Sequence, residues 1–460
     1  MRIDPVIFRQ YDIRGLVGKE LTAEVARAVG CAVGTEARER LGRTPRLVVG
    51  RDNRPSGPDL LAALSEGLVA TGADVLSVEL VPTPVLYFAI HHLQGDGGVQ
   101  VTGSHNPPEF NGLKMVLGGL PLAGEDIQAL RRRIEGDRFV EGRGRVSQHE
   151  VLAEYRTEVV LRIGPLARPV RVVVDCGNGT GSIAGPQLLR ALGAEVIELF
   201  CESDGTFPNH HPDPTVLANL ADLRREVVAR GAELGIAFDG DADRIGAVDE
   251  RGEVLFGDQL LILYGRDLSQ RVGPGQEVIF DVKCSDAVAE ALTAAGARPT
   301  MWMTGHSHIK KRMKETGAPL AGEMSGHMFF GPPDYLGFDD ALYAASRLLK
   351  IVAEGDRKLS TLLADVPRYV STPEIRVDCT EAQKVPLVAA AAAYFAARYD
   401  TVTIDGVRWR TAEGWGLIRA SNTQPILVMR FEARTAEGLA RIRDEAVRVM
   451  AAEGVRVQAS

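Results

Sequence analysis

The chain has 460 residues, too many for one hydrophobic core, and the usual domain size of roughly 100 to 200 residues predicts three or four domains. Apolar residues make up 45% and charged residues 25% of the chain, as in ordinary water-soluble proteins, and the net charge of −8 argues against nucleic-acid binding. The N-terminal stretch lacks the pattern of a signal peptide, and no apolar run is long enough to span a bilayer, so we expect a cytoplasmic protein without membrane contact. The five cysteines have no metal-binding spacing and are expected to be buried, reduced thiols without chemistry.

A pattern of strand, polar turn and helix recurs three times along the chain. Each copy begins with a β-branched run that ends in an aspartate, namely Asp52, Asp175 and Asp281. Each helical stretch then stops at a Gly-Ala pair, where glycine suits a left-handed cap. The alternation predicts three repeated α/β domains with mixed, mainly parallel sheets.

The third strand-like run of each copy ends in a polar loop, at Ser104, Asp239 and Glu323. Because ligands of α/β sheets gather beyond the carboxyl ends of the strands, we expect the three loops to converge on one central cleft. From about Pro367 the pattern changes to short strand-like runs and a closing helix near Arg441–Val449, which predicts a distinct C-terminal α+β domain. The expected domains are residues 1–150, 151–253, 254–366 and 367–460.

The loop "DGDADR" places three carboxylates, Asp239, Asp241 and Asp243, at alternate positions. Such carboxylates repel one another unless a divalent cation neutralises them, so the loop predicts a Mg²⁺ site. A calcium loop of the EF-hand type is the alternative, but Arg244 stands where that loop needs glycine. The guanidinium group of Arg244 instead offers paired N–H donors that suit phosphate oxygens.

Ser104 lies in "VTGSHNPPEFNGLK", beside His105 and ten residues before Lys114. A phosphoserine there would bring about two negative charges and three acceptor oxygens to a metal ion held by the aspartate loop. We therefore interpret Ser104 as a nucleophile that carries a phosphoryl group. A plain turn capped by its own hydroxyl is the alternative.

Other loops carry weaker signals. Glu323, Ser325 and His327 form a set that suits sugar hydroxyls. The turn Arg419–Pro425 could hold a second phosphate through side chains and backbone amides. His306 and His308 are separated by one residue, a spacing that is compatible with a metal site. A substrate contact or a turn at the start of a helix is the favoured interpretation.

Five stretches, "FRQYDIRG", "TGSHNPPEFNGLK", "DGDADR", "GEMSGH" and "RASNTQP", occur in the order and spacing of the α-D-phosphohexomutases. The chain resembles the bacterial phosphomannomutase/phosphoglucomutase branch over essentially its whole length. The resemblance implies four domains around a central cleft, with a smaller, mobile last domain, and an enzyme that moves phosphate between the 1- and 6-positions of a hexose. Ala242 stands where many relatives have glycine, and Met324 distinguishes this branch from glucosamine-phosphate relatives, which usually have glutamine there.

The resemblance also implies roles for individual residues. Ser104 would be the phosphoserine and a metal ligand beside Asp239, Asp241 and Asp243, while Glu323 and Ser325 would bind sugar hydroxyls. The phosphate that is not reacting would be held by four residues, Arg419, Ser421, Asn422 and Thr423. The reacting end would be lined by Tyr11, Arg14, His105, Lys114, Arg244, Lys283, His306 and His327.

The implied reaction is a phosphoryl transfer from Ser104 to hexose 1-phosphate, giving a hexose 1,6-bisphosphate that turns end for end before a phosphate returns to Ser104. The phosphates of glucose or mannose are the expected partners, with Mg²⁺ as cofactor and glucose 1,6-bisphosphate as activator.

Alternative functions are a phosphoglucosamine mutase, a Mg²⁺-dependent sugar phosphatase and a catalytically silent sugar-phosphate sensor. The general acid or base stays open among His327, His306 and Lys114. A monomer or weak homodimer is expected.

Overall fold

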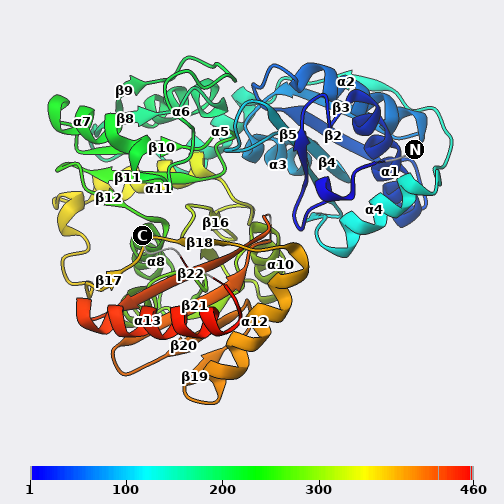
Figure 1. The fold of residues 1–460 in the computed structure, drawn as a ribbon. Coiled ribbons are helices and arrows are strands. Elements are labelled where there is room, and N and C mark those ends of the chain that lie inside the picture. Colours follow the sequence, from blue (N-terminus) through cyan, green and yellow to red (C-terminus); the bar gives the residue numbers. More distant parts are fainter. Residues whose placement is uncertain (1–2, 423, 456, 458–460) are drawn as a thin grey trace.

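The computed structural model describes all residues except 1–2, 423, 456 and 458–460. The described residues form four sheets with helices packed against them, and each sheet belongs to one continuous part of the sequence. In Figure 1 the first part (blue and cyan) and the second part (green) occupy the top of the view, and the last part (orange and red) lies below them. This arrangement confirms the predicted fold class of three α/β repeats and a distinct C-terminal domain.

The first domain is built on a sheet of mixed direction. Its strands are β1 (Ile13–Leu16), β2 (Arg46–Arg51), β3 (Asp74–Leu80), β4 (Gly97–Val101), β5 (Phe110–Leu117), β6 (Leu120–Pro121) and β7 (Val146–Gln148), and its helices are α1 (Ala23–Leu41), α2 (Gly57–Ala70), α3 (Thr83–His92) and α4 (Glu125–Glu135). The order is β1-β5-β4-β2-β3-β7, with β6 beside β5.

Alternation along β2 explains why helices cover both faces of this sheet. Leu47 and Val49 point into the core with α1, α2 and α4, whereas Val48 packs with α3 on the other face. Helices α1 and α2 approach very closely, because a Cβ added at Gly67 would stand 2.1 Å from the Arg27 backbone oxygen. Any side chain at this position would force the two helices apart.

The second and third domains repeat the plan. Their strands are β8 (Arg171–Asp175), β9 (Glu195–Leu199), β10 (Leu234–Phe238), β11 (Ile245–Asp249) and β12 (Val254–Leu255), then β13 (Glu277–Asp281), β14 (Arg298–Trp302), β15 (Leu320–Gly322) and β16 (Met328–Phe330). Their helices are α5 (Leu152–Ile163), α6 (Gly185–Leu192), α7 (Ala221–Arg230), α8 (Gly257–Val272), α9 (Asp286–Ala294), α10 (His306–Thr316) and α11 (Ala341–Glu354). In every repeat the first strand (β2, β8 or β13) pairs in parallel with the second and third, and the third pairs antiparallel with the next strand.

The C-terminal domain is a separate antiparallel sheet. Its elements are β17 (Val370–Ser371), β18 (Ile375–Asp378), α12 (Glu381–Ala396), β19 (Asp400–Val402), β20 (Val407–Arg410), β21 (Gly414–Ala420), β22 (Ile426–Ala433) and α13 (Ala436–Ala452). The strand order is β17-β22-β21-β20-β19, and β18 also pairs with β22. The two helices pack with this sheet around a core of their own, which includes Trp409 stacked on Phe395.

The apolar core distinguishes the first three domains from the last. One cluster of buried side chains runs from α3 through α5, α6 and α8 to α11, and so joins the first three domains into one packed body. The C-terminal domain meets the third domain through a small apolar contact of Val282 with Trp415 and Leu417, and through the ion pair of Arg408 with Asp286 at 2.9 Å. No helix in the described part of the chain is both long and apolar enough to cross a membrane.

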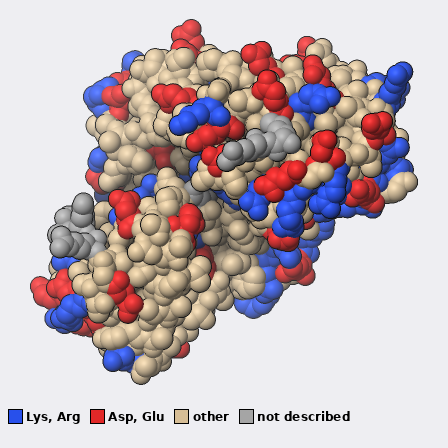
Figure 2. Space-filling view, turned by 45° about the vertical axis from the view of Figure 1, so that its right-hand side comes forward, with Lys and Arg blue, Asp and Glu red and all other residues tan. Residues whose placement is uncertain are grey.

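Charges of both signs are interspersed on the face that Figure 2 draws. A recess separates the lower lobe from the upper part of the molecule in that view, and acidic and basic side chains stand at its edges.

Candidate functional site

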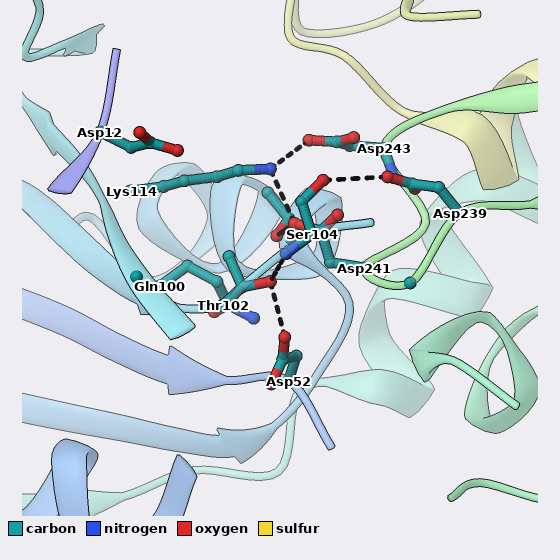
Figure 3. A network of polar contacts seen from close by, with 12 residues as sticks. Asp12, Asp52, Gln100, Thr102, Ser104, Lys114, Asp239, Asp241 and Asp243 are labelled. Carbon is teal, nitrogen blue, oxygen red and sulfur yellow. Dashed lines mark hydrogen bonds and ion pairs between the residues drawn. The ribbon is translucent and has the colours of Figure 1, made fainter. Parts of the chain in front are cut away.

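The ends of three equivalent strands meet in the interior of the molecule. Ser104 follows β4, Asp239 follows β10 and Glu323 follows β15, and all three residues are almost fully buried. Figure 3 shows Ser104 between Lys114 on one side and the aspartate loop on the other. The loop after β10 is held from both neighbouring domains, because the Thr83 amide donates to the Asp241 backbone oxygen and the Ala341 amide to that of Ala242. Two of the predicted loops, those of Ser104 and Asp239, are in direct contact, because the Ser104 hydroxyl lies within hydrogen-bond distance of Asp239.

Ser104 has an unusual backbone conformation for a residue with a side chain. Its φ angle is +50°, in the left-handed region that costs an L-residue about 1–2 kcal/mol. Its hydroxyl donates to Asp239 Oδ2 at 3.1 Å, and His105 Nδ1 lies 3.2 Å from Ser104 Oγ. Burial, with help from Arg244 and Arg14, lowers the pKa of His105 well below its ordinary value, so its ring is neutral at pH 7.

The strained serine loop is built on Asp52 and Arg54, which follow strand β2. Asp52 Oδ2 accepts from the Thr102 hydroxyl at 2.8 Å and from the Gly103 amide at 3.0 Å. The Arg54 guanidinium is fully buried and donates through Nε to Asp52. Its four remaining N–H groups donate to backbone oxygens of the serine loop, namely Ser104 (2.8 Å), Asn106 (2.6 Å), Pro107 (2.6 Å) and Phe110 (3.0 Å). Arg54 thus satisfies all five of its donors and fixes the loop that presents Ser104.

The three aspartates of "DGDADR" are fully buried and close together. Asp239 Oδ1 accepts from the amides of Asp243 at 3.0 Å and Arg244 at 3.2 Å, which closes the loop. Lys114 Nζ lies 2.7 Å from Asp241 Oδ2 and 2.5 Å from Asp243 Oδ2. Burial opposes the charge of Lys114, but Asp241 and Asp243 prevail and raise the pKa of this amine well above its ordinary value. Lys114 is therefore a fixed ammonium beside Ser104.

The residues present fit a Mg²⁺ ion. One candidate ligand atom from each aspartate lies within 4.8 Å of the others, and Asp241 Oδ1 and Asp243 Oδ1 are buried without a hydrogen-bond partner among the described residues. Burial together with Asp243 and Asp241 raises the pKa of Asp239 well above its usual range, so the protein alone supplies too little positive charge for three carboxylates. An all-oxygen site with buried, unpaired carboxylate oxygens suits a hard cation such as Mg²⁺.

Arg244 and His327 continue the site into the third domain. Arg244 Nε donates to His327 Nε2 at 2.9 Å, which leaves the His327 proton on Nδ1. That nitrogen lies 3.1 Å from Asp339 Oδ2. Burial favours the neutral acid, but Lys310, at 2.7 Å, and the two nearby histidines hold the pKa of Asp339 well below its usual range. The charged Asp339 carboxylate therefore faces His327 Nδ1, although the two atoms are not aligned for a hydrogen bond.

The sugar loop is also preorganised. Glu323 Oε1 accepts from the Gly305 amide at 2.7 Å and Oε2 from the Ser325 hydroxyl at 2.9 Å. Both carboxylate oxygens keep further acceptor capacity for hydroxyl groups. His306 begins helix α10, in agreement with the helix-entry interpretation, and its ring stacks on His327 with centroids 5.6 Å apart. Burial lowers the pKa of His306 well below its ordinary value.

A second group of predicted residues surrounds Arg419 in the C-terminal domain. Arg419 Nε donates to Asp405 Oδ2 at 2.9 Å, and its Nη2 is buried without a hydrogen-bond partner in the described part of the chain. Asn422 donates to the Tyr11 hydroxyl, which in turn donates to the Thr304 backbone oxygen at 2.9 Å. Tyr11 thereby joins the first domain to the third and the fourth. Ser421 lies in the same turn, and Thr423 lies outside the described residues.

The remaining predicted residues lie at the edges of these two groups. Arg14 forms an ion pair with Asp12 and donates to Asn106 Oδ1 at 2.7 Å, beside the serine loop. Lys283 faces Glu374 at 3.4 Å, between the third and fourth domains.

Sequence reasoning missed four positioning residues. Arg54 and Asp52 support the serine loop, Asp339 supports His327 and Asp405 supports Arg419. Asp52 directly follows the first strand of its repeat, a position that the sequence pattern identifies, but no local signal marks Arg54 as its buried partner. Asp339 and Asp405 lie in loops 12 and 14 residues from the side chains they contact, and no local pattern identifies them.

Models of one protein family match the chain in four successive parts. Residues 5–141, 256–369 and 158–252 match α/β/α domains I, III and II of phosphoglucomutase/phosphomannomutase, and residues 374–449 match its C-terminal domain. The chain belongs to the phosphoglucomutase/phosphomannomutase family. The five sequence stretches that suggested the α-D-phosphohexomutases therefore identified this family correctly.

Individual members of the family resemble the chain over nearly its full length. A phosphomannomutase/phosphoglucomutase of Pseudomonas aeruginosa is 50% identical over 95% of this chain and 94% of its own length. A phosphoglucomutase of Neisseria meningitidis is 46% identical over 95% of each chain. The crystal structure of a family protein from Burkholderia thailandensis superimposes with a TM-score of 0.91 at 44% identity and covers 99% of both chains.

Proposed function

We propose that the chain interconverts hexose 1-phosphates and hexose 6-phosphates, with mannose and glucose phosphates as substrates, through a phosphorylated Ser104. The observation that carries the proposal is the Ser104 hydroxyl, which is presented at φ +50° and lies 3.1 Å from Asp239 of the carboxylate triad. A hydroxyl in this position suits a phosphoryl group that faces the triad on one side and Lys114 on the other. Family membership supports the same activity.

Phosphoryl transfer requires positioning and charge stabilisation more than covalent chemistry. The sugar hydroxyl attacks the phosphorus of phosphorylated Ser104, the bond from phosphorus to Ser104 Oγ breaks, and negative charge spreads over the three transferring oxygens. Lys114 and Arg244 carry fixed positive charge at this point. Asp239, Asp241 and Asp243 would hold Mg²⁺, which supplies a further positive charge when bound.

The proton of the attacking hydroxyl needs an acceptor. His306 and His327 face the site from the third domain, and the low pKa of His306 keeps its ring neutral at pH 7. Asp339 faces Nδ1 of His327, whose Nε2 accepts from Arg244 and can accept a hydroxyl proton when Arg244 turns to a phosphate. Lys114, held as an ammonium between two carboxylates, suits charge stabilisation better than proton abstraction.

The second phosphate of the sugar is held at the other group of residues. Asn422 and Arg419, whose buried Nη2 has no partner among the described residues, provide donors for it. Glu323 and Ser325 contact the ring hydroxyls between the two ends. A hexose 1,6-bisphosphate that turns end for end returns its other phosphate to Ser104. If the bisphosphate escapes first, added glucose 1,6-bisphosphate phosphorylates Ser104 again and acts as an activator. All these residues come from one chain, so a monomer suffices.

Phosphorus NMR tests the proposal directly. The protein with Mg²⁺ and a trace of glucose 1,6-bisphosphate receives mannose, glucose or glucosamine 1-phosphate in separate tubes. Conversion of mannose and glucose 1-phosphates to 6-phosphates is expected. Preferential conversion of glucosamine 1-phosphate would identify a phosphoglucosamine mutase. Steady release of inorganic phosphate would identify a phosphatase, and no reaction in any tube would favour a sugar-phosphate sensor.

Ser104→Ala separates chemistry from binding. The variant lacks the oxygen that carries the phosphoryl group, so turnover should disappear while sugar-phosphate binding, measured by calorimetry, stays within a few-fold of the parent protein. Unchanged turnover in this variant would refute the role of Ser104.

A further inference from the structure

Two of the five cysteines meet in the second domain. Cys176 follows the last residue of β8, Cys201 lies just beyond β9, and their Sγ atoms are 3.2 Å apart. The two strands are parallel neighbours whose ends lie at the same edge of the sheet, and the Cys176 amide donates to the Leu199 backbone oxygen at 3.2 Å. A disulfide needs its sulfur atoms about 2.05 Å apart, so a movement of about 1 Å would join them.

The two thiols differ in exposure. Cys176 is fully buried, and burial raises the pKa of its thiol well above the ordinary value. Cys201 is half-buried, which corrects the expectation that all five thiols are buried. An oxidant therefore reaches Cys201 first, and Cys176 stands behind it as a second sulfur. Among the described contacts of the other three cysteines, none involves a second sulfur atom.

We propose that Cys176 and Cys201 are a site of reversible oxidation to an intramolecular disulfide, with a hydroperoxide as oxidant. The Cys201 thiolate attacks the peroxide, the O–O bond breaks, and Cys201 becomes a sulfenic acid as hydroxide leaves and is protonated. The Cys176 sulfur then attacks the Cys201 sulfur, its proton leaves with the hydroxyl group as water, and the S–S bond forms. The two thiols lose two electrons and hydrogen peroxide becomes two water molecules. A dithiol reductant reverses the reaction by exchange.

The chain that follows Cys176 supports the metal loop. The Thr180 amide and hydroxyl donate to the Gly240 backbone oxygen at 2.9 and 3.2 Å. Gly240 lies between Asp239 and Asp241, and a Cβ added at Gly179 would stand 2.7 Å from the same Gly240 oxygen. Because the two segments are in such close contact, we expect a shift of Cys176 to be passed through Gly179 and Thr180 to the aspartate loop. Oxidation is therefore expected to lower the activity.

The experiment uses the full chain loaded with Mg²⁺. It is treated with hydrogen peroxide, its remaining thiols are blocked with N-ethylmaleimide, and its peptides are mapped by mass spectrometry. We expect a linked pair of peptides that contain Cys176 and Cys201. Because a misplacement of about 1 Å at a catalytic group costs up to about 100-fold in rate, we expect oxidation to reduce mutase activity at least about tenfold, with recovery in dithiothreitol.

Two variants complete the test. Cys201→Ser should keep its activity in peroxide, whereas Cys379→Ser, a half-buried cysteine of the C-terminal domain, should lose activity as the parent protein does. Absence of the linked peptides would overturn the proposed site, and full activity of the linked protein would overturn its coupling to the metal loop. The activity measurement relies on the proposed mutase function, but the peptide map does not, so failure of one can be distinguished from failure of the other.

Discussion

Arg54→Lys tests whether the serine loop is held by a single buried guanidinium. Arginine has five donors, and all five are used here, one on Asp52 and four on backbone oxygens of the loop. Lysine has three donors on one nitrogen, so at least two of these acceptors lose their partner. A buried acceptor left unpaired costs about 1–3 kcal/mol, so the loop loses at most about 2–6 kcal/mol, and less where one of the three part-buried acceptors binds water instead.

This loss should appear in turnover rather than in substrate affinity. Ser104 is held at φ +50°, and a loop with fewer hydrogen bonds relaxes away from that strained conformation. If only about 2 kcal/mol of the loss reaches the transition state, kcat falls about 30-fold. KM should change little, because the residues proposed to hold the second phosphate lie on the C-terminal domain, around Arg419.

Steady-state assays with glucose 1-phosphate measure both constants, and intact-protein mass spectrometry measures how much of Ser104 is phosphorylated. Arg51→Lys is the matched control, because Arg51 donates to the Asp52 backbone oxygen at 3.2 Å rather than to the serine loop. Circular dichroism shows whether each variant is folded. A folded Arg54→Lys protein with kcat within threefold of its parent would refute the reasoning, as would an equal loss in Arg51→Lys.

Three further predictions concern the metal loop, the phosphate clamp and a buried acid. Asp241→Asn removes one negative charge from the three aspartates. After treatment with a chelator, the variant should need at least about tenfold more Mg²⁺ for half-maximal activity. An unchanged Mg²⁺ titration would contradict the role of Asp241 as a metal ligand. Asp405→Asn weakens the hydrogen bond that holds the Arg419 side chain. KM should rise about three- to tenfold at similar kcat. A fall in kcat alone would contradict the role of Arg419 in binding the second phosphate. Burial raises the pKa of Asp340 to about 7, so its carboxyl group binds a proton more tightly in the folded state than in the unfolded state. The free energy of unfolding should therefore fall as the pH rises from about 4 to about 7. The melting temperature of Asp340→Asn should therefore fall less between pH 5 and pH 8 than that of the parent protein, and equal slopes would exclude this contribution.

Local patterns were sufficient to predict the repeats and the polar loops. In all three repeats the β-branched run that leads to an aspartate is a strand that ends at or just before it. Asp52 and Asp281 both bind the polar loop that follows the third strand of their own repeat. What each aspartate binds was not predictable, because the partner lies about 40 to 50 residues away and is chosen by the sheet topology.

Buried charged residues were the main omission. Arginine is normally exposed, so nothing in the sequence around Arg54 indicates a fully buried side chain. Its burial becomes understandable only once four backbone oxygens of a folded loop are seen to point at it. The contact of Tyr11 with Asn422 is another case, since it joins residues 411 positions apart through the docking of whole domains.

The distribution of the core explains how one site can combine rigid chemistry with a substrate that turns. The first three domains share one apolar cluster, so moving any of them would expose buried apolar surface, and the contacts of Ser104 with Asp239 and of Thr83 with Asp241 stay fixed. The C-terminal domain has a separate core and a small apolar contact with the third domain. Its link to the first domain through Asn422 and Tyr11 is polar and easily exchanged for water. We therefore expect opening between the C-terminal domain and the rest of the molecule to expose less apolar surface than any movement among the other three domains, although polar contacts such as that of Arg408 with Asp286 must also break. Such an opening would place the mobility at the proposed phosphate clamp and keep it away from the serine.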